Sequence, residues 1–446
     1  MRRLLIVSPH FPPVAAPDLQ RVRMSLAHYR EYGWDPVVLA VEPAGVAAPL
    51  EADLLGTFPD DIDVHRCRAW PRRFGFGTLG LRALRPLQLA GDRLLAARRF
   101  DLVFFSTTQF VTLRLGPRWR RRFGVPYVVD IQDPWRTGAY ERPGAPRPPG
   151  GWKYQFARLL AWRLEERCFR DAAGFMSVSP RYLADLGARY AWFAGRPQAT
   201  IPFGVAPADL AVARRLPLPP ELPPRAAGEV RLVYTGAAGP ILPGAVNVLF
   251  AALRRFREQY PAQADRLRLL FLGTHYLPAG LARPALAALA AREGVADLVF
   301  ELPHRLGHLQ SLRCLLEADA LLLLGSSDPA YSPSKLYPYY QSGKPILGLV
   351  YAGSHLEALL GELACAHLAV IPPDDAGTAP DGTIADFFRQ ALAGFPLGAQ
   401  PPRNEDLFRR NCLAEPLTRQ QCELFAKAVA ASCSPLSSGR SPAVAS

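Results

Sequence analysis

The sequence lacks the features that define several large classes of protein. Its apolar runs, such as residues 320–325, are far shorter than the roughly 20 residues that a membrane-spanning helix needs. Its seven cysteines are odd in number and include no Cys-x-x-Cys pair, which argues against a disulfide framework and against zinc. No His-Glu-x-x-His or Gly-x-Ser-x-Gly segment occurs, so zinc peptidases and serine hydrolases have no support.

These absences leave a cytoplasmic globular protein as the expectation. The apolar stretch near the N-terminus, around residues 4–7, is short and suits a buried strand rather than a secretory signal. Charged residues make up 20% of the chain and hydrophobic residues 49%, which is the balance of a folded protein. A chain of 446 residues is expected to form two domains.

Lysine is scarce, and the positive charge is unevenly placed. Only 4 of the 52 basic residues are lysines. Residues 1–220 hold 32 basic and 19 acidic residues, a net charge of +13, whereas residues 221–446 hold 20 of each. A genome that favours arginine codons would explain the arginines but would not spare the second half. We therefore expect the first half to face an anionic partner, such as a membrane surface.

Short, solidly apolar segments alternate with helical segments, which predicts two α/β domains with parallel sheets. In the first half, strands are expected at residues 4–7, 36–41, 101–105, 127–131, 174–178 and 199–202. The pattern restarts with strands at 230–236, 268–273, 299–301 and 320–325, separated by helices that include one at 280–293. Each domain resembles a doubly wound fold, so ligands are expected beyond the carboxyl ends of the strands, in the cleft between the domains.

Composition predicts the domain boundaries. We expect an N-terminal domain at residues 1–213, a proline-rich linker at 214–228 and a C-terminal domain at 229–417. A last amphipathic helix is expected at 418–431, followed by a frayed tail rich in Ser, Pro and Ala at 432–446.

Two loops of the first half carry candidate catalytic side chains. Asp133 follows an apolar strand in the segment Asp-Ile-Gln-Asp-Pro-Trp, where a carboxylate can orient a hydroxyl or accept its proton. Capping of the turn ahead of Pro134 is the alternative. His10 ends the first strand and is expected to serve as a functional hydrogen-bonding group, with an ordinary loop residue as the alternative.

In the second half, a predicted strand is followed by the segment Thr-Gly-Ala-Ala-Gly-Pro at 235–240, which contains Gly236 and Gly239. This segment lacks the third glycine of a dinucleotide loop and the ending of a P-loop, so it is either a plain turn or a phosphate cradle. His304 and Arg305 end a later strand, from where they could touch a base or a phosphate.

Two other charged segments have simpler interpretations. Asp-Asp-Ile-Asp at 60–63 lies in a polar connection without further ligands, so no metal site is expected there. The arginines of 119–124 precede Gly124 at a helix C-terminus, where they complement the helix dipole, and no nucleic acid is expected as a partner. Residues 68–99 and 152–170 interleave Arg with Trp, Phe and Leu, which is typical both of a membrane-interfacial surface and of packed amphipathic helices.

The segment Ser-Pro-Ser-Lys-Leu-Tyr-Pro-Tyr-Tyr at 332–340 predicts a helix that begins at its first serine and proline. Pro338 then falls inside the helix, at a cost of about 3 kcal/mol. Two of the four lysines of the chain, Lys335 and Lys344, lie in or beside this segment.

Several segments together resemble family-4 glycosyltransferases of GT-B architecture. They are Pro-His-Phe-Pro-Pro (9–13), Arg-Val-Arg (21–23), Glu-Tyr-Gly-Trp-Asp-Pro-Val-Val-Leu (31–39), Asp-Ile-Gln-Asp-Pro-Trp (130–135), Ser-Pro-Ser-Lys-Leu-Tyr (332–337) and Ser-Gly-Lys-Pro-Ile (342–346). The resemblance implies two facing Rossmann-like domains, with a nucleotide-sugar on the C-terminal domain and a saccharide or lipid-linked acceptor on the N-terminal domain. It also implies that the last helix crosses back to the first domain, that neither metal nor cofactor is needed, and that transfer retains the anomeric configuration.

The resemblance assigns donor-binding roles to individual residues. Backbone N–H groups at the start of a helix would face the diphosphate, with Lys335 adding a positive charge. The donor loop comprises Ser334, Lys335, Leu336 and Tyr337. The turn from Gly236 to Gly239, the pair Thr274 and His275, and the pair His304 and Arg305 would line the rest of the pocket.

The sequence departs from the family where two glutamates are usual, because Ala330 and Pro338 stand at those positions. We predict a glycosyltransferase that acts on a lipid-linked or surface-polysaccharide precursor, in the cytoplasm or on the inner face of the membrane, with Asp133 orienting the acceptor. A nucleotide-sugar epimerase of similar fold and a catalytically inactive partner protein are the alternatives.

Overall fold

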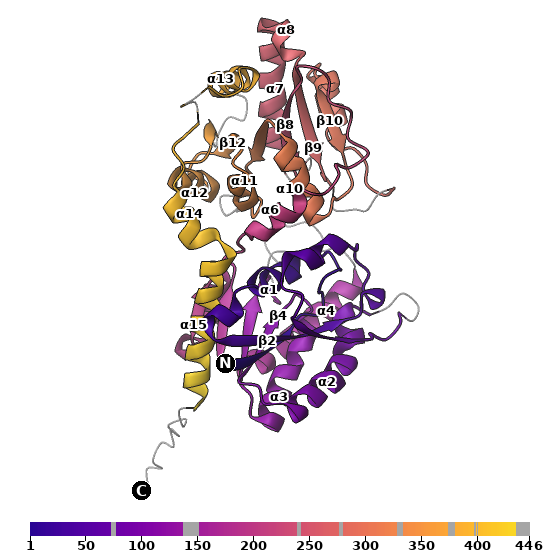
Figure 1. Ribbon diagram of the computed structural model, residues 1–446, viewed down its shortest axis with the longest axis vertical. Coiled ribbons are helices and arrows are strands. Elements are labelled where there is room, and N and C mark those ends of the chain that lie inside the picture. Colours follow the sequence, from indigo (N-terminus) through magenta and orange to yellow (C-terminus); the bar gives the residue numbers. More distant parts are fainter. Residues whose placement is uncertain are drawn as a thin grey trace. The chain divides into compact units, whose positions relative to one another are not determined.

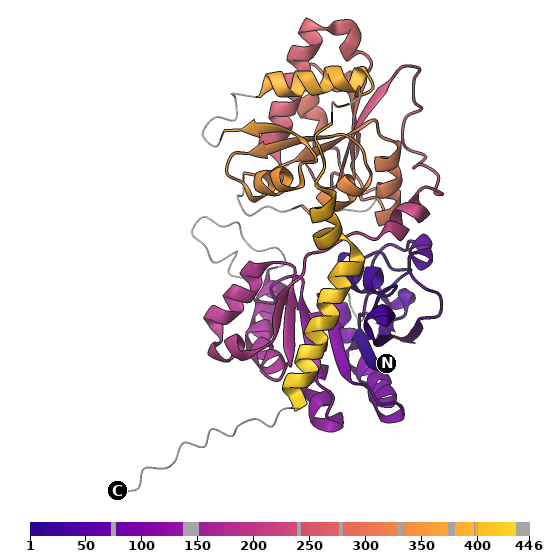
Figure 2. The same cartoon turned by 60° about the vertical axis from the view of Figure 1, so that its left-hand side comes forward.

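The computed structural model describes residues 1–72, 77–136, 151–238, 242–275, 280–327, 333–372, 380–396, 398 and 400–433. These residues form two α/β units (Figures 1 and 2). The first unit comprises Met1–Phe203 together with the chain from Ala414 onward, and the second comprises Gly204–Leu413. Within the described residues, no helix is long and apolar enough to cross a membrane.

A parallel sheet forms the centre of the first unit. Its strands are β1 (Arg2–Val7), β2 (Trp34–Val41), β3 (Asp63–Cys67), β4 (Leu102–Ser106), β5 (Tyr127–Ile131), β6 (Gly174–Ser177) and β7 (Gln198–Thr200). Their order is β3-β2-β1-β4-β5-β6-β7, so the winding reverses between β1 and β4. Open α/β sheets bind ligands beyond the carboxyl ends of the strands at such a reversal.

Helices cover both faces of this sheet, because its strands are apolar on both sides. One face packs against α2 (Leu79–Ala97), α3 (Leu115–Phe123), α4 (Trp152–Phe169) and α5 (Pro180–Arg189). The other face packs against α1 (Gln20–Ser25) and α15 (Ala414–Cys433). Short 3₁₀ turns complete the unit: η1 (Pro17–Leu19), η2 (Tyr29–Tyr32), η3 (Pro43–Gly45), η4 (Ala52–Thr57), η5 (Phe110–Arg114) and η7 (Ala191–Gly195).

The long helix α15 returns to the first unit and packs on its sheet (Figure 2). Phe425 is fully buried there, with its ring centroid 5.0 Å from that of Phe104 and 5.5 Å from that of Trp34. The hydroxyl of Tyr29 donates to Gln421 Oε1 at 2.8 Å. The last segment before the C-terminal tail is therefore part of the core of the first unit.

Replacing Phe425 by alanine is expected to lower the free energy of unfolding of the first unit by about 3–5 kcal/mol, because it removes a large side chain from a packed core. All seven tryptophans lie within residues 1–203, so their fluorescence during a urea titration reports on this unit alone. Lys427→Ala, at an exposed position of the same helix, is the control. A Phe425→Ala effect as small as that of the control would mean that α15 does not stabilise the unit.

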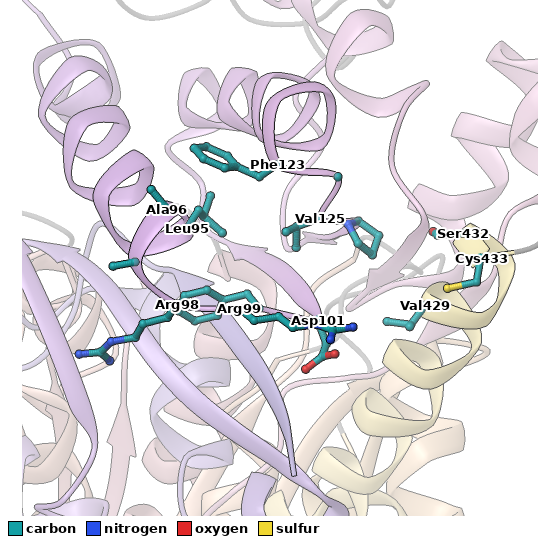
Figure 3. A pocket seen from close by; sticks show the side chains of 14 residues that line it. Leu95, Ala96, Arg98, Arg99, Asp101, Phe123, Val125, Val429, Ser432 and Cys433 are labelled. Atoms are coloured by element: carbon teal, nitrogen blue, oxygen red, sulfur yellow. The ribbon is translucent and has the colours of Figure 1, made fainter.

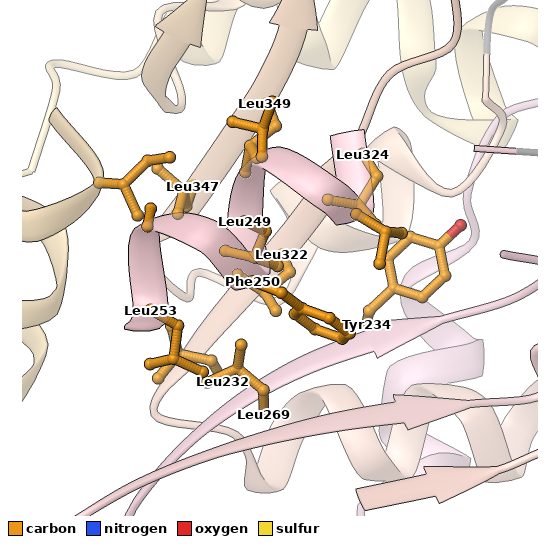
Figure 4. Packing of buried hydrophobic residues seen from close by; sticks show 14 of the residues in the cluster. Leu232, Tyr234, Leu249, Phe250, Leu253, Leu269, Leu322, Leu324, Leu347 and Leu349 are labelled. Carbon is orange, nitrogen blue, oxygen red and sulfur yellow. The ribbon is translucent and has the colours of Figure 1, made fainter. Parts of the chain in front are cut away.

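The second unit is built on a parallel sheet with the order β10-β9-β8-β11-β12-β13. Its strands are β8 (Val230–Thr235), β9 (Leu267–Leu272), β10 (Val299–Leu302), β11 (Ala320–Leu324), β12 (Ile346–Tyr351) and β13 (His367–Ile371). Its helices are α6 (Pro207–Ala213), α7 (Pro243–Gln259), α8 (Pro261–Ala264), α9 (Ala287–Arg292), α10 (His308–Glu317), α11 (Leu336–Gln341), α12 (His355–Leu363), α13 (Asp381–Leu392) and α14 (Glu405–Cys412), with the 3₁₀ turn η9 (Ala296–Leu298). In Figure 4, Leu249 and Phe250 of α7 pack against Leu322 of β11 in the core.

The fold confirms the prediction of two α/β doubly wound domains, but the division between them differs from the predicted boundaries. The second unit already begins at Gly204, because α6 packs against α10. The proline-rich segment 214–228 also lies in the second unit: Arg313 Nε donates to the carbonyl of Leu216 at 2.9 Å, and Arg231 Nη2 to that of Pro223 at 2.8 Å. The predicted linker is therefore held along the second unit.

Candidate active site

In the first unit, the segments that follow β1 and β4 meet around the buried carboxylate of Asp18. Nδ1 of His10 lies 2.7 Å from Asp18 Oδ1. Asp18 Oδ2 accepts hydrogen bonds from the Thr107 hydroxyl at 3.1 Å and from both the N–H and the hydroxyl of Thr108 at 3.0 Å. Because β1 and β4 are neighbours in the sheet, their loops come together although they are about a hundred residues apart.

This arrangement keeps the carboxyl group of Asp18 ionised. Burial alone would raise the pKa of Asp18, but the hydrogen bond and charge of His10 and the hydrogen bonds from Thr108 leave that pKa below its usual value. The ionised carboxylate accepts a hydrogen bond from Nδ1–H of His10, so in the tautomer with a single ring proton the lone pair lies on Nε2. No partner of Nε2 is recorded in the described part of the chain. A nitrogen in this state can take the proton of a hydroxyl group.

A further layer of buried polar groups supports these loops. The side-chain amide of Gln132 donates to the carbonyl of Asp18 at 3.0 Å and to Asp130 Oδ2 at 2.9 Å. Arg21 Nε donates to the same oxygen of Asp130 at 2.8 Å, and both side chains are almost inaccessible. Asp130, which lies within β5, thus has a structural role.

Asp133 differs from Asp130 because its side chain is exposed. Partial loss of hydration is the larger cause, and the negative charge of Asp18 the smaller one, of a raised pKa of the Asp133 carboxyl group. No hydrogen bond of its carboxylate, including one that would cap the turn before Pro134, is recorded among the described residues. Asp133 is therefore available to a ligand near the His10–Asp18 pair.

In the second unit, the ammonium group of Lys335 lies against Tyr234, one residue before the end of β8. Its Nζ donates to the Tyr234 hydroxyl at 2.6 Å and lies 3.9 Å from the centre of the ring, a cation–π contact. The Tyr234 hydroxyl donates in turn to the carbonyl of Ala237 at 2.6 Å. Among the described residues no carboxylate is recorded as a partner of Lys335, and burial lowers its pKa to about 7. A phosphate at this position would restore the full positive charge.

Gly236 allows this close approach. Its φ of +108° lies in the region that favours glycine, and a Cβ at this position would lie 2.8 Å from the Lys335 Nζ. The structure thus brings together two residues that the sequence placed in one donor pocket. Gly239, the other glycine of the predicted cradle, lies outside the described residues, as does Ala330.

The helix predicted to start at residues 332–333 begins only at Leu336, so Pro338 is its third residue. A proline in the first turn deletes no helical hydrogen bond, because N–H groups there have no partner within the helix. The N–H groups of Leu336 and Tyr337 donate to the carbonyls of Pro333 and Ser334. Those two N–H groups are therefore already used and are not free to form the implied diphosphate cradle, which leaves the Lys335 ammonium as the candidate anion-binding group of the loop.

Thr274 was assigned to the donor pocket, but its side chain is bound within the protein. Its buried hydroxyl donates to Glu301 Oε1 at 2.5 Å, and the Glu301 carboxylate also accepts the N–H groups of Ala285 and Leu286 at 2.9 Å. These bonds hold the segment before α9 in an irregular conformation, which is why the helix predicted at 280–293 begins only at Ala287.

The remaining predicted donor residues lie at the ends of β9 and β10 or in the donor loop. The N–H of His275 donates to the carbonyl of Pro303 at 2.8 Å, so the two strand ends are adjacent. His304 Nε2 lies 3.7 Å from Glu221 Oε1, and Arg305 is exposed. In the donor loop, Leu336 is a buried packing residue, Ser334 is exposed, and burial raises the pKa of Tyr337 to about 12, so Tyr337 stays neutral.

Sequence reasoning did not single out Asp18, Thr107, Thr108 or Tyr234. Asp18 stands in Pro-Asp-Leu, which is typical of a helix start, and nothing local signals its contact with His10. Tyr234 lies in an apolar strand and looks like a core residue. The only available signal was that these residues end parallel strands or follow them.

A pocket of 560 Å³ in the first unit lies away from these residues (Figure 3). It is lined by Asp101 and Pro126, which directly precede β4 and β5, and by Cys433 at the end of α15. It therefore opens at the amino ends of the strands, opposite to the edge where a doubly wound sheet binds its ligand.

A family model matches most of the first unit of this chain. Residues 20–204 match the family model of the glycosyl transferase 4-like domain. Within these residues the chain is similar to a glycosyltransferase domain. No curated protein matches the sequence.

Solved structures show that the glycosyltransferase has the GT-B fold. Sucrose-phosphate synthase from Thermosynechococcus elongatus superposes with a TM-score of 0.59 at 17% identity, covering 97% of this chain and 100% of its own. Anabaena HepE in complex with UDP and glucose gives 0.55 at 15% identity, with 96% and 100% covered. Trehalose 6-phosphate synthase from Burkholderia multivorans gives 0.53 at 16% identity, with 97% and 100% covered. The prediction of a GT-B glycosyltransferase is confirmed, and neither the epimerase nor the inactive partner is favoured.

Proposed function

We propose that the enzyme transfers a sugar from a nucleotide-sugar bound by the second unit to a hydroxyl of an acceptor bound by the first. The observation that carries the proposal is the Lys335 ammonium, held against Tyr234 and Gly236 without a recorded carboxylate partner among the described residues. A buried ammonium group without a carboxylate partner is stabilised more by a bound diphosphate than an ammonium group in water would be. The complex of Anabaena HepE with UDP and glucose supports a nucleoside diphosphate sugar as donor.

In the proposed reaction, the acceptor oxygen forms a bond to the anomeric carbon while the bond from that carbon to the diphosphate breaks. The acceptor proton passes to Nε2 of His10, and the ionised Asp18 stabilises the imidazolium that forms. The negative charge that develops on the departing diphosphate is stabilised by Lys335. Asp133 accepts a hydrogen bond from the acceptor and orients it.

Within this proposal the enzyme needs neither a metal ion nor a cofactor and retains the anomeric configuration, as the resemblance to family 4 implies. The acceptor is a lipid-linked or surface-polysaccharide precursor, handled at the cytoplasmic surface of a membrane. The excess of basic residues in the first half supports an anionic surface as the place of reaction.

A thermal-shift screen against UDP-, GDP- and dTDP-sugars tests the donor class, and the Lys335→Met variant distinguishes specific from adventitious binding. A rise in the melting temperature that the variant loses is expected for one nucleotide. Absence of a shift with every nucleotide-sugar would contradict the proposed function.

Metal independence and stereochemistry are tested with the donor that the screen selects. Turnover is expected to be unchanged in excess EDTA, because Lys335 supplies the charge that a metal ion would otherwise provide. The proton NMR spectrum of the first product formed is expected to show the anomeric configuration of the donor. Loss of activity in EDTA that added Mg²⁺ or Mn²⁺ restores would refute metal independence, and an inverted product would refute retention.

A further inference from the structure

One helix of the first unit presents a large apolar surface to solvent. On α4, Trp152 and Trp162 are each 65% exposed, Phe156 is 55% exposed and Leu159 is 51% exposed. Their spacing places them on one side of the first three turns, because an α-helix has 3.6 residues per turn. The opposite side of the helix carries Ala161 and Cys168, which are buried. Soluble proteins seldom expose so many large apolar side chains together to water.

Cationic side chains continue this surface along the same helix. Arg163, Arg167 and Arg170 are exposed in its second half, and Arg136 lies 5.7 Å from the ring centre of Trp162. Arg170 is paired with Glu166, whereas no ion pair of Arg163 or Arg167 is recorded within the described part of the chain. The apolar turns are therefore followed by positive charge that is largely uncompensated.

A groove of 760 Å³ between α2, α3 and α4 adds to this charge. Five arginines and two acidic residues line it. Arg118 and Arg121 lie near Asp92 and Asp171, but Arg114 has no recorded ion pair among the described residues. The groove is therefore large enough and positive enough to bind anionic lipid head groups. The neighbouring helix α4 carries apolar side chains that can enter the boundary between head groups and acyl chains.

We propose that α4 and the adjoining arginine groove form a docking surface for an anionic phospholipid bilayer. Tryptophan side chains are suited to the head-group region, where the ring is apolar and the indole N–H stays hydrated. Arginines pair with lipid phosphates, and each cation near an anionic surface strengthens binding. The combination of charge and aromatic exposure favours a membrane over a second protein, whose interface would bury the apolar residues with fewer uncompensated cations.

This surface would hold the acceptor-binding unit at the membrane, where a lipid-linked acceptor is found. That role rests on the proposed function, whereas membrane docking as such does not. Docking itself needs neither donor nor acceptor. Variants Lys335→Met and His10→Ala are therefore expected to bind vesicles as the wild type does. Normal vesicle binding without sugar transfer would count against the proposed function alone.

The test is co-sedimentation of the full chain with vesicles of phosphatidylcholine alone and of phosphatidylcholine with 40% phosphatidylglycerol. Binding is expected only to the anionic vesicles, with a shift of tryptophan emission to shorter wavelength. The double variant Trp152→Ser, Trp162→Ser is expected to bind about tenfold more weakly. The variant Arg163→Gln, Arg167→Gln is expected to lose about fivefold for each cation.

Leu50→Ser is the control, since Leu50 is 62% exposed in the same unit but lies outside α4 and outside both segments that interleave arginine with aromatic residues. Unchanged circular dichroism and melting temperature show that each variant is folded. Equal binding to neutral and anionic vesicles, or equal losses in the control and in the α4 variants, would overturn the proposal. So would a concentration-dependent dimer, seen by sedimentation, that the α4 tryptophan variant abolishes, because a second copy would then be the partner.

Discussion

Replacing Lys335 by methionine is expected to lower kcat/KM for sugar transfer by about 10²–10³-fold, the usual effect of removing one preorganised group that stabilises developing negative charge. Methionine keeps the apolar stem that packs near Tyr234 and removes only the ammonium group. Release of the nucleoside diphosphate from the donor measures turnover, and calorimetry measures donor affinity. Lys427→Met, an exposed lysine on α15, is the control. Unchanged turnover and affinity in Lys335→Met would refute its assignment.

Donor binding is also expected to depend on pH through this residue. With its pKa lowered to about 7 in the free enzyme, Lys335 is protonated below that pH and increasingly neutral above it. A bound diphosphate raises the pKa, so binding takes up a proton above pH 7. The affinity of the wild type is therefore expected to fall by about tenfold for each pH unit above 7, a dependence that Lys335→Met loses.

The same pKa predicts the effect on stability. A lysine whose pKa falls on folding destabilises the native state at pH values where it must stay charged, and this penalty disappears as pH rises from about 7 toward 10.5. Without donor, Lys335→Met is expected to melt at a higher temperature than the wild type at pH 6, and the difference should shrink at pH 9. A lower melting temperature at pH 6 would mean that Lys335 stabilises the fold.

His10→Ala is expected to lower kcat by about 10²–10⁴-fold, the range for loss of a general base. Donor affinity should stay unchanged, because the donor binds in the second unit. Asp18→Asn provides the sharper test. The Thr108 N–H would hold the amide oxygen at the place of Oδ2, which leaves the amide NH₂ facing Nδ1 of His10. His10 would then carry its proton on Nε2 and could not act as a base.

His28→Ala is the matched control for His10, since His28 lies in the same unit and contacts only Glu31 in the recorded bonds. Calorimetry with the donor and a urea titration followed by tryptophan fluorescence separate loss of catalysis from loss of folding. Transfer at the wild-type rate by His10→Ala, or by Asp18→Asn, would contradict the proposed base.

The amino-acid sequence determined the fold class and predicted that Gly236 and Lys335 lie together. Continuous apolar runs separated by helical segments specify parallel strands covered on both faces, and the strands predicted at 4–7, 127–131 and 230–236 lie where they were expected. Gly236 and Lys335 were assigned together because their motifs keep the family order. Such information is local, since it depends on residue type and short-range periodicity.

Only the tertiary structure decided which polar groups act together. The contact of His10 with Asp18 depends on η1 folding back over β1, and that of Asp18 with Thr108 depends on the pairing of β1 with β4. The helix expected to begin at 332–333 begins at Leu336, so the apparent defect at Pro338 vanishes. The carboxylate of Glu301, distant in sequence, shortens the helix expected at 280–293. Long-range hydrogen bonds to buried groups outweigh local propensity, because an unpaired buried group costs more than a residue of helix gains.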